Sequence, residues 1–170
     1  MNSLQFKTNE LKKLSAIIGF KPEFVKLLIN NIDNYYYEWK EDKIDKKTGG
    51  FKRYKDGTIK VRVIRPSKGE LKVIQTRIKN RILSKIELPS NVHGGVKKRS
   101  NISNAKAHQG NKYQFTTDLQ DFYPNISPKQ VYETLISSGY SSHFSHLVTK
   151  LMTWKYGLPQ GTPTSPHLAN

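Results

Sequence analysis

Residues 118–123 bring two carboxylates and two aromatic rings close together in the chain. The lead-in to Asp118 is apolar and β-branched, which predicts a strand that ends at this carboxylate. Asp121 comes three residues later, and Phe122 and Tyr123 come directly after it. Mg²⁺ is usually held by one or two carboxylates together with phosphate oxygens of its substrate, so a strand-end acid suits such a cation. An edge strand that ends in a solvated acid accounts for the same residues.

The composition indicates one globular domain or slightly more. The chain has 170 residues, of which 35% are hydrophobic and 11% aromatic, which is enough to build a core. It contains no cysteine, which excludes disulfides and thiolate metal sites and favours a reducing compartment. There is no run of eighteen apolar residues, and residues 1–7 lack the build of a signal peptide. We therefore expect a cytoplasmic protein with no membrane partner.

The formal net charge of +16 is concentrated in the first hundred residues. Residues 101–170 hold five of the 29 Lys and Arg residues and three of the 13 Asp and Glu residues, which leaves a net charge of +14 in the first hundred. A basic half of this kind is typical of nucleic-acid binders. A basic surface that only keeps the protein soluble is the alternative. An anionic membrane surface is disfavoured, because no helix has a basic face opposite a broad apolar one.

The first 34 residues are predicted to form two amphipathic helices that pack on a core and carry no chemistry. Gly19 ends the first helix and Pro22 begins the second. Helical spacing places these apolar residues on the inner faces: Leu11, Leu14 and Ile18, then Phe24, Leu28 and Ile32.

A basic β-hairpin is predicted next. Residues 35–39 favour a strand, and residues 51–64 favour a hairpin that turns at an Asp-Gly pair. In the second strand of this hairpin the apolar residues alternate with Lys60 and Arg62, so one face is basic. Such a face is suited to holding phosphates, and a solvated surface is the plainer interpretation.

Helices and a loop rich in Pro and Gly make up the remainder. The spacing from Ser67 to Glu70, and again from Ser127 to Gln130, is that of a capping box at a helix start. A short helix is predicted over residues 101–108, and the order of elements gives an α+β fold. Helical spacing predicts these inner residues: Leu71, Ile74, Gln75, Ile78 and Ile82; Val131, Leu135 and Ile136; and Phe144, Leu147, Val148, Leu151 and Met152.

Four local patterns occur in one order along the chain. They are Arg62-Val-Ile-Arg-Pro-Ser67, the loop from His93-Gly94 through Arg99-Ser100 to Asn104-Ala-Lys-Ala-His108, the stretch Thr117-Asp-Leu-Gln-Asp-Phe-Tyr-Pro-Asn-Ile126, and Leu158-Pro-Gln-Gly161 followed by Ser-Pro and Asn. Together they resemble the reverse transcriptases, specifically the prokaryotic retron and group II intron-like branch. The Asn-Ala-x-x-His element is typical of the retron-like members. The resemblance covers roughly residues 35–170.

The resemblance implies the fingers and an incomplete palm of a right-hand polymerase, with an antiparallel sheet and flanking helices. It divides the chain into N-terminal helices (1–34), a basic fingers region (35–112) and a partial palm (113–170). It also implies RNA-directed DNA polymerase activity, in which a primer 3′-hydroxyl attacks the α-phosphate of a deoxynucleotide. The implied partners are an RNA template, a DNA or RNA primer and deoxynucleoside triphosphates. The implied cofactor is a pair of Mg²⁺ ions, or Mn²⁺ in their place.

The resemblance assigns roles to individual residues of the partial palm. Asp118 matches a catalytic, metal-binding aspartate, and the backbone carbonyl of Leu119 matches its companion ligand. Tyr123 matches an aromatic residue that blocks a ribose 2′-hydroxyl. Gln160 and Gly161 match a glutamine beside the incoming nucleotide and a glycine that permits close backbone approach.

The basic part of the chain receives its roles in the same way, and more loosely. Arg62, with Lys52 or Lys55, matches the finger residues that hold the triphosphate. Asp121 is interpreted as structural, taking backbone hydrogen bonds at the strand end. The expected nucleic-acid contacts are Lys97, Lys98, Arg99, Asn104 and His108.

The chain departs from the family pattern in one respect that matters for catalysis. The Tyr/Phe-x-Asp-Asp motif, which supplies the remaining metal carboxylates, occurs nowhere in the sequence, and no thumb is present. We therefore expect this polypeptide alone to be inactive or nearly so. It would be a fragment, a truncated reading frame, or half of a split enzyme whose C-terminal half another chain supplies.

Two other functions remain open from the sequence. The first is a non-catalytic RNA-binding module built from a truncated polymerase fold, with affinity that falls steeply as salt rises. The second, a zinc hydrolase built on His143 and His146, is disfavoured because these residues lie three apart on a helix whose inner face is apolar. The sequence does not distinguish antiviral defence, a retron and intron mobility as the biological role, and it does not define the template RNA, the priming mode or the oligomeric state.

Overall fold

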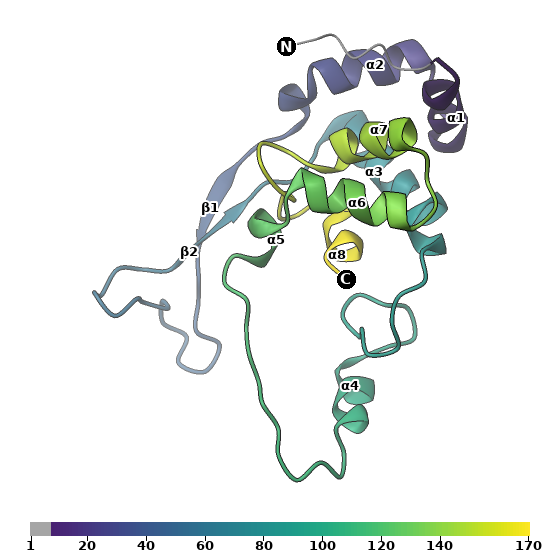
Figure 1. Cartoon of the computed structure of the whole chain (residues 1–170). Coiled ribbons are helices and arrows are strands. Elements are labelled where there is room, and N and C mark those ends of the chain that lie inside the picture. Colours follow the sequence, from purple (N-terminus) through teal and green to yellow (C-terminus); the bar gives the residue numbers. More distant parts are fainter. Residues whose placement is uncertain (1–7) are drawn as a thin grey trace.

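The computed structural model describes residues 8–170, so the expectation about a signal peptide in residues 1–7 lies outside the described part. The fold is α+β, as predicted, and helices are its main regular elements (Figure 1). The elements follow in the order α1 (Thr8–Ile18), α2 (Pro22–Asn30), the 3₁₀ helix η1 (Ile32–Tyr35), β1 (Trp39–Asp42), β2 (Val61–Ile64), α3 (Gly69–Arg81), the 3₁₀ helix η2 (Leu83–Lys85), α4 (Asn101–Ala107), α5 (Phe122–Asn125), α6 (Pro128–Ser137), α7 (Ser142–Met152) and α8 (Ser165–Leu168).

One hydrophobic core joins helices from distant parts of the chain. α3 packs on α1 and α7, and α6 packs on α7. The predicted inner faces of α1, α3 and α7 are all buried. Three details differ from the prediction. The inner face of α2 is made of Val25, Leu28 and Ile29, while Phe24 is only half-buried. Ile32 lies beyond α2, in η1, and is half-buried. Ile136 of α6 is exposed.

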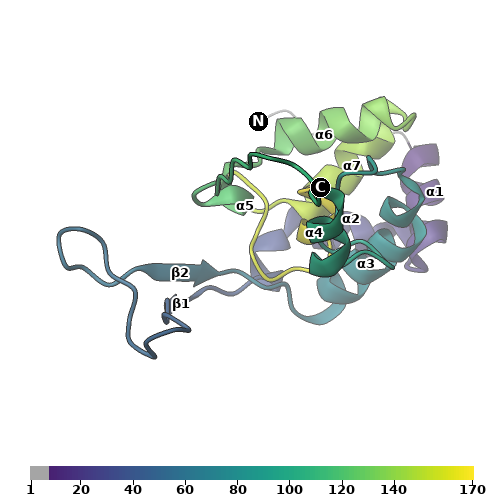
Figure 2. The same cartoon turned by 90° about the horizontal axis from the view of Figure 1, so that it is seen from below.

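The sheet has two antiparallel strands and projects from the helical body (Figures 1 and 2). Trp39 pairs with Ile64, and Glu41 pairs with Arg62. The predicted strand at residues 35–39 therefore begins later, after η1, and extends into acidic residues. The predicted Asp-Gly turn is present, since Tyr54 N–H donates to the carbonyl of Thr58 at 2.8 Å. The segment between β1 and β2 folds back on itself, so that the backbones of residues 43, 52 and 60 are hydrogen-bonded to one another.

The predicted strand that leads to Asp118 is not formed. Residues 113–119 have no regular secondary structure and run as a long segment away from the helices (Figure 1). Tyr113 is 82% exposed and Phe115 is 93% exposed. A strand is stabilised by hydrogen bonds to a neighbouring strand, and β1 and β2 pair with each other instead. The predicted antiparallel sheet is present as β1 and β2, which project from the helical body (Figure 1).

The capping box predicted at Ser127 is present, but the one predicted at Ser67 is not. Ser127 and Gln130 exchange their side-chain-to-backbone hydrogen bonds at the start of α6. α3 instead begins after Lys68 without a side-chain cap. The Ser67 hydroxyl points into the core, where it donates to Gln75 Oε1 at 2.6 Å.

Gln75 is the centre of a buried polar network. Its side chain is fully buried, and Nε2 donates to the Tyr36 hydroxyl at 2.9 Å and to the Leu151 carbonyl at 2.8 Å. Burial raises the pKa of Tyr36 well above its usual value, so this phenol stays neutral. One amide therefore connects both strands' inner ends to the C-terminal end of α7.

No helix within residues 8–170 has the length and apolar character needed to cross a membrane.

The Gln75 network predicts a large stability effect for a single substitution. Gln75→Leu is expected to lower the free energy of unfolding by about 2–4 kcal/mol, because two hydroxyls and a carbonyl lose their partner in a dry interior. Urea unfolding measures the change. Thr76→Ala is the control, since the Thr76 hydroxyl bonds only within its own helix, to the Lys72 carbonyl. Equal stability of the two variants would refute a central role for the network.

Candidate functional site

The loop at residues 157–161 touches the turn that follows Asp118. Leu158 N–H donates to the Ile126 carbonyl at 3.1 Å. Gly157 is buried, and a Cβ at this position would lie 2.3 Å from the Pro124 carbonyl oxygen. Only glycine permits this approach, since real side chains essentially never come so close. Two patterns that lie more than thirty residues apart in the sequence are thus held together by their backbones.

The other side of the same loop touches the end of β2. Arg65 N–H donates to the Gln160 carbonyl at 2.7 Å. Gly161 has a left-handed φ of +102°, and a Cβ there would lie 3.2 Å from Ile64 Cγ2. The loop therefore requires glycine at position 161, both for the backbone conformation and for the close contact with Ile64.

Buried hydroxyl groups fix the shape of this loop. Ser165 Oγ donates to the Pro159 carbonyl at 2.7 Å and lies 2.6 Å from Thr162 Oγ1. Thr162, Thr164 and Ser165 are all buried. Such a satisfied polar network makes the loop rigid, which is what a binding site needs.

The loop at residues 93–99 is held by hydrogen bonds from side chains to backbone carbonyls. Asn170 Nδ2 donates to the Gly94 carbonyl at 2.6 Å. Arg99 Nη1 donates to the Pro89 carbonyl at 2.7 Å and to the Val92 carbonyl. Arg99, which was predicted as a nucleic-acid contact, is half-buried, and its guanidinium stabilises the shape of its own loop.

A small ionic cluster lies where the hairpin meets the 154–161 loop. Arg65 Nε lies 2.6 Å from Glu38 Oε2, and Lys155 Nζ lies 3.5 Å from the same oxygen. The hydrogen bond from Arg65, with the charges of Arg65 and Lys155, lowers the pKa of Glu38. The cluster anchors the residue whose N–H holds Gln160.

The predicted palm residues are only partly brought to this loop. Tyr123 is half-buried against the core and contacts Phe122, with ring centroids 5.9 Å apart. Asp118 and Leu119 are exposed, and no hydrogen bond or ion pair in the described chain holds the Asp118 side chain. Asp121 has a left-handed φ of 48°, and its side chain makes no capping bond at the start of α5. Its carbonyl, rather than its carboxylate, takes a backbone hydrogen bond, from Asn125 N–H at 3.3 Å.

Two of the three predicted triphosphate-binding residues share a cleft near the outer part of the hairpin. The cleft is open and has a volume of about 660 Å³. Lys52 and Arg62 line it, whereas Lys55 lies in the exposed Asp-Gly turn and does not. The other lining residues are Glu41, Asp42, Lys43, Ile44, Asp45, Lys46 and Lys47.

The remaining predicted nucleic-acid contacts are on or beside α4. Lys97 and Lys98 are exposed, and so are Asn104 and His108. Lys98 has a left-handed φ of 65°. α4 stands away from the helical core in Figure 1, so these side chains are open to a partner.

The residues present do not by themselves fit a site for two divalent cations. Asp118 and the carbonyl of Leu119 would offer two oxygen donors on an exposed segment. Within residues 8–170, no three His, Cys, Asp or Glu side chains gather as a possible metal site. Mg²⁺ prefers near-octahedral oxygen coordination, and two donors on an exposed segment fall short of what a pair of such ions would need.

Several residues that position the site were not singled out from the sequence. Arg65 and Pro66 were part of a quoted pattern but received no role, although they hold Gln160 and Gly161. Gly157 carried a usable signal, a glycine just before Leu-Pro-Gln-Gly. Its partner Pro124 could not be found without the fold.

Comparison with known proteins finds retron reverse transcriptases. The chain is 32% identical over 162 residues to the retron Ec86 reverse transcriptase of Escherichia coli, which covers 95% of this chain and 47% of that protein. It is 31% identical over 163 residues to the retron Se72 reverse transcriptase of Salmonella heidelberg (strain 579083-10), covering 94% of this chain and 39% of the relative. The retron Mx162 reverse transcriptase of Myxococcus xanthus is 31% identical over 127 residues, covering 64% and 26%. The chain thus spans less than half the length of these relatives. No protein-family model matches it.

The close approach at Gly157 predicts the effect of one added methyl group. Gly157→Ala is expected to lower the free energy of unfolding by about 1–3 kcal/mol, because the new Cβ must displace the Pro124 backbone. Gly50→Ala is the control, since its nearest neighbour, Thr48 Oγ1, is 3.7 Å away. Thermal unfolding of both variants tests this, and a neutral Gly157→Ala would mean that the two motifs are not in contact.

The ionic cluster predicts a specific pH dependence. The carboxylate of Glu38 is favoured in the folded state, so its stabilising effect is present above the ordinary glutamate pKa and is lost as the pH falls through the lowered value. A carbon-detected NMR titration should find the Glu38 midpoint below that of an unpaired glutamate. Arg65→Gln should raise the Glu38 midpoint, because the hydrogen bond from Arg65 is the largest cause of the lowered pKa. An unchanged midpoint in Arg65→Gln would show that the pair does not form.

Proposed function

Because the chain belongs to the retron-type reverse transcriptase family, we propose that it forms part of an RNA-directed DNA polymerase. The reaction would add a deoxynucleotide to a primer 3′-hydroxyl opposite an RNA template, with pyrophosphate leaving. RNA, primer and deoxynucleoside triphosphates are the partners that this reaction requires.

The observation that carries this proposal is the convergence on one loop of patterns that lie far apart in the sequence. Gln160 and Gly161 contact the end of β2, and Gly157 and Leu158 contact the turn after Asp118. A polymerase needs its template strand, nucleotide and catalytic acid side by side, since positioning supplies most of the catalysis in phosphoryl transfer. The contacts of this loop support such a site.

Within that site the residues of this chain would bind and orient rather than complete the chemistry. Gln160 lies half-buried at the edge of the rigid loop, where its amide is suited to hydrogen bonds with a nucleotide or template base. Tyr123, half-buried beside Phe122, would present a ring edge against a sugar. Lys52 and Arg62 would meet phosphate oxygens, for which Arg offers a bidentate fork.

Catalysis would also need divalent cations, which stabilise charge on the transferring phosphoryl group. Asp118 and the Leu119 carbonyl are the ligands that this chain would contribute. These two donors do not make a complete site, so we propose that the 170-residue polypeptide is inactive without carboxylates from a further segment, in the same chain or in another.

Primer extension tests both parts of the proposal. The 170-residue chain, with an RNA template, a DNA primer and either Mg²⁺ or Mn²⁺, is expected to incorporate no deoxynucleotide above background. A chain that continues through the whole coding sequence after Asn170, including a Tyr/Phe-x-Asp-Asp, is expected to extend the primer. Asp118→Ala should reduce that activity by about a thousandfold or more, since a metal ligand is lost.

Lys55→Ala in the longer chain is the matched control, because Lys55 lies outside the cleft. Incorporation that survives Asp118→Ala would refute the role of this aspartate. A gene without any downstream Tyr/Phe-x-Asp-Asp would instead favour the non-catalytic RNA-binding module. The net charge of +14 in the first hundred residues is consistent with that alternative.

A further inference from the structure

Two exposed aromatic rings are stacked on each other at the base of the hairpin. Tyr37 is 46% exposed and Trp39 is 38% exposed. Their ring centroids lie 5.2 Å apart, with the planes 25° from parallel. Trp39 Nε1 donates to Glu41 Oε1 at 2.8 Å, which fixes the orientation of the indole. The pair therefore forms a flat, oriented and accessible aromatic surface.

The strand register places this surface beside the Gln160–Gly161 loop. Directly opposed residues of an antiparallel pair point to the same face of the sheet, and Trp39 is opposed to Ile64. Ile64 Cγ2 is the nearest neighbour of a Cβ built on Gly161. The face that carries Trp39 is thus the face against which the candidate site lies.

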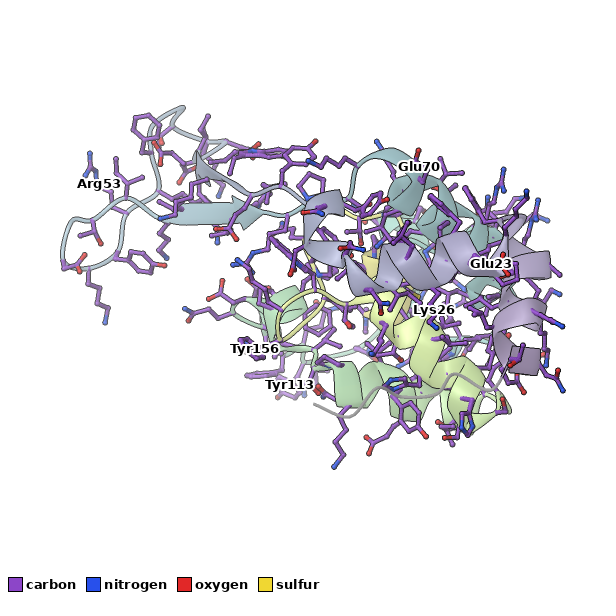
Figure 3. All side chains as sticks on the ribbon, turned by 90° about the horizontal axis from the view of Figure 1, so that it is seen from above. Glu23, Lys26, Arg53, Glu70, Tyr113 and Tyr156 are labelled. Carbon is purple, nitrogen blue, oxygen red and sulfur yellow. The ribbon has the colours of Figure 1, made fainter. Side chains whose placement is uncertain are left out.

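The same register connects the aromatic pair to the basic cleft. Glu41 is two residues from Trp39 and is opposed to Arg62, so these side chains share the Trp39 face. Both Glu41 and Arg62 line the cleft at the outer part of the hairpin. A continuous track therefore runs along one face of the hairpin, from the cleft over Trp39 to Gly161. Arg53 marks the outer end of the hairpin in Figure 3, far from the helices that carry Glu23 and Glu70.

The charge along this track suits a polyanion. Five cationic side chains line the cleft, against three carboxylates: Lys43, Lys46, Lys47, Lys52 and Arg62, with Glu41, Asp42 and Asp45. One of the acids is already engaged, since Glu41 accepts the Trp39 N–H. Lys60 adds a further cation nearby on the hairpin, with Nζ 5.0 Å from the Tyr54 ring centroid. A protein partner for the aromatic pair would have to tolerate this excess of cations, whereas a nucleic acid is attracted by it.

We propose that Tyr37 and Trp39 form a base-stacking platform for single-stranded nucleic acid, whose phosphates are held in the cleft lined by Lys43, Lys46, Lys47, Lys52 and Arg62. Stacking on aromatic rings combined with a basic groove is how single strands are bound without sequence preference. Only the role of the platform, which would guide a single strand toward the Gln160–Gly161 loop, rests on the proposed function. Binding itself needs no polymerase activity.

Fluorescence anisotropy with the 170-residue chain tests this inference. The probes are end-labelled oligouridine and oligothymidine of about a dozen nucleotides, and an abasic strand with the same number of phosphates. Trp39→Ala is expected to weaken binding of the two base-carrying strands by about tenfold and to leave the abasic strand unaffected, because only stacking is lost. Tyr37→Ala should give the same pattern.

Tyr156→Ala is the matched control, since Tyr156 is an aromatic residue with 90% exposure that lies in the turn before Leu158 rather than on the hairpin. It should bind all strands as the wild type does. Lys47→Gln and Lys52→Gln should weaken binding of all three strands. Each should reduce the slope of log affinity against log salt by about 0.7, whereas Trp39→Ala should leave that slope unchanged.

The outcomes separate this inference from the proposed function. Equal binding of base-carrying strands by Trp39→Ala and the wild type, with matching thermal unfolding curves, would overturn the platform whatever the polymerase assay shows. Weaker binding of the abasic strand by Trp39→Ala would overturn stacking as its mechanism. An affinity that depends more on the sugar of the probe than on the presence of bases would show that the site reads the backbone of RNA or DNA. That result would likewise contradict the platform. A failed primer extension with intact Trp39-dependent binding would refute only the polymerase.

Discussion

The arrangement of this molecule depends on one buried amide. Gln75 is on α3, the helix that packs on both α1 and α7, and its side chain contacts Ser67, Tyr36 and the Leu151 carbonyl. Tyr36 and Ser67 are bridged to each other at the inner ends of the two hairpin strands. Leu151 is in the last turn of α7, from which the 154–161 loop emerges. A buried amide that satisfies three groups at once is stabilising only in one geometry, so it sets how the hairpin and the loop leave the helical core.

Aromatic and backbone contacts carry that geometry outward. Trp154 stacks on Tyr36 with ring centroids 4.8 Å apart and donates to Asp33 Oδ1 at 2.6 Å. The loop then passes between the end of β2 and the Pro124 turn, with glycine at both points of closest approach. The candidate site is therefore assembled mainly by backbone groups. The side chains that remain free to face a ligand are those that the loop holds at its edge, Gln160 above all.

The helices could be predicted from the sequence because their signals are local. The stripe from Leu71 to Ile82 and the capping box at Ser127 each depend only on residues within a few turns. The network at Gln75 was not predicted, because Ser67 was interpreted as a helix cap while its hydroxyl bonds eight residues away, in the core. The segment before Asp118 shows the opposite error. Its β-branched and aromatic residues favour a strand, but strand propensity is a preference for a partner's surface, and the described chain offers none.

The motifs that carry family resemblance were found from their types and order, but their contacts were not. Nothing in residues 62–67 indicates that Arg65, rather than Arg62, would meet the Gln160 loop through its backbone. The exposure of Asp118 has an electrostatic consequence. Several carboxylates gathered around absent cations repel one another, so a complete metal site costs stability until the ions bind. Within residues 8–170 no such group of acids is gathered, and Asp118 lies on a solvated segment, so the described chain bears none of that cost. The proposed binding of a single strand on the hairpin therefore places no requirement on a complete metal site, and binding and catalysis can be measured separately.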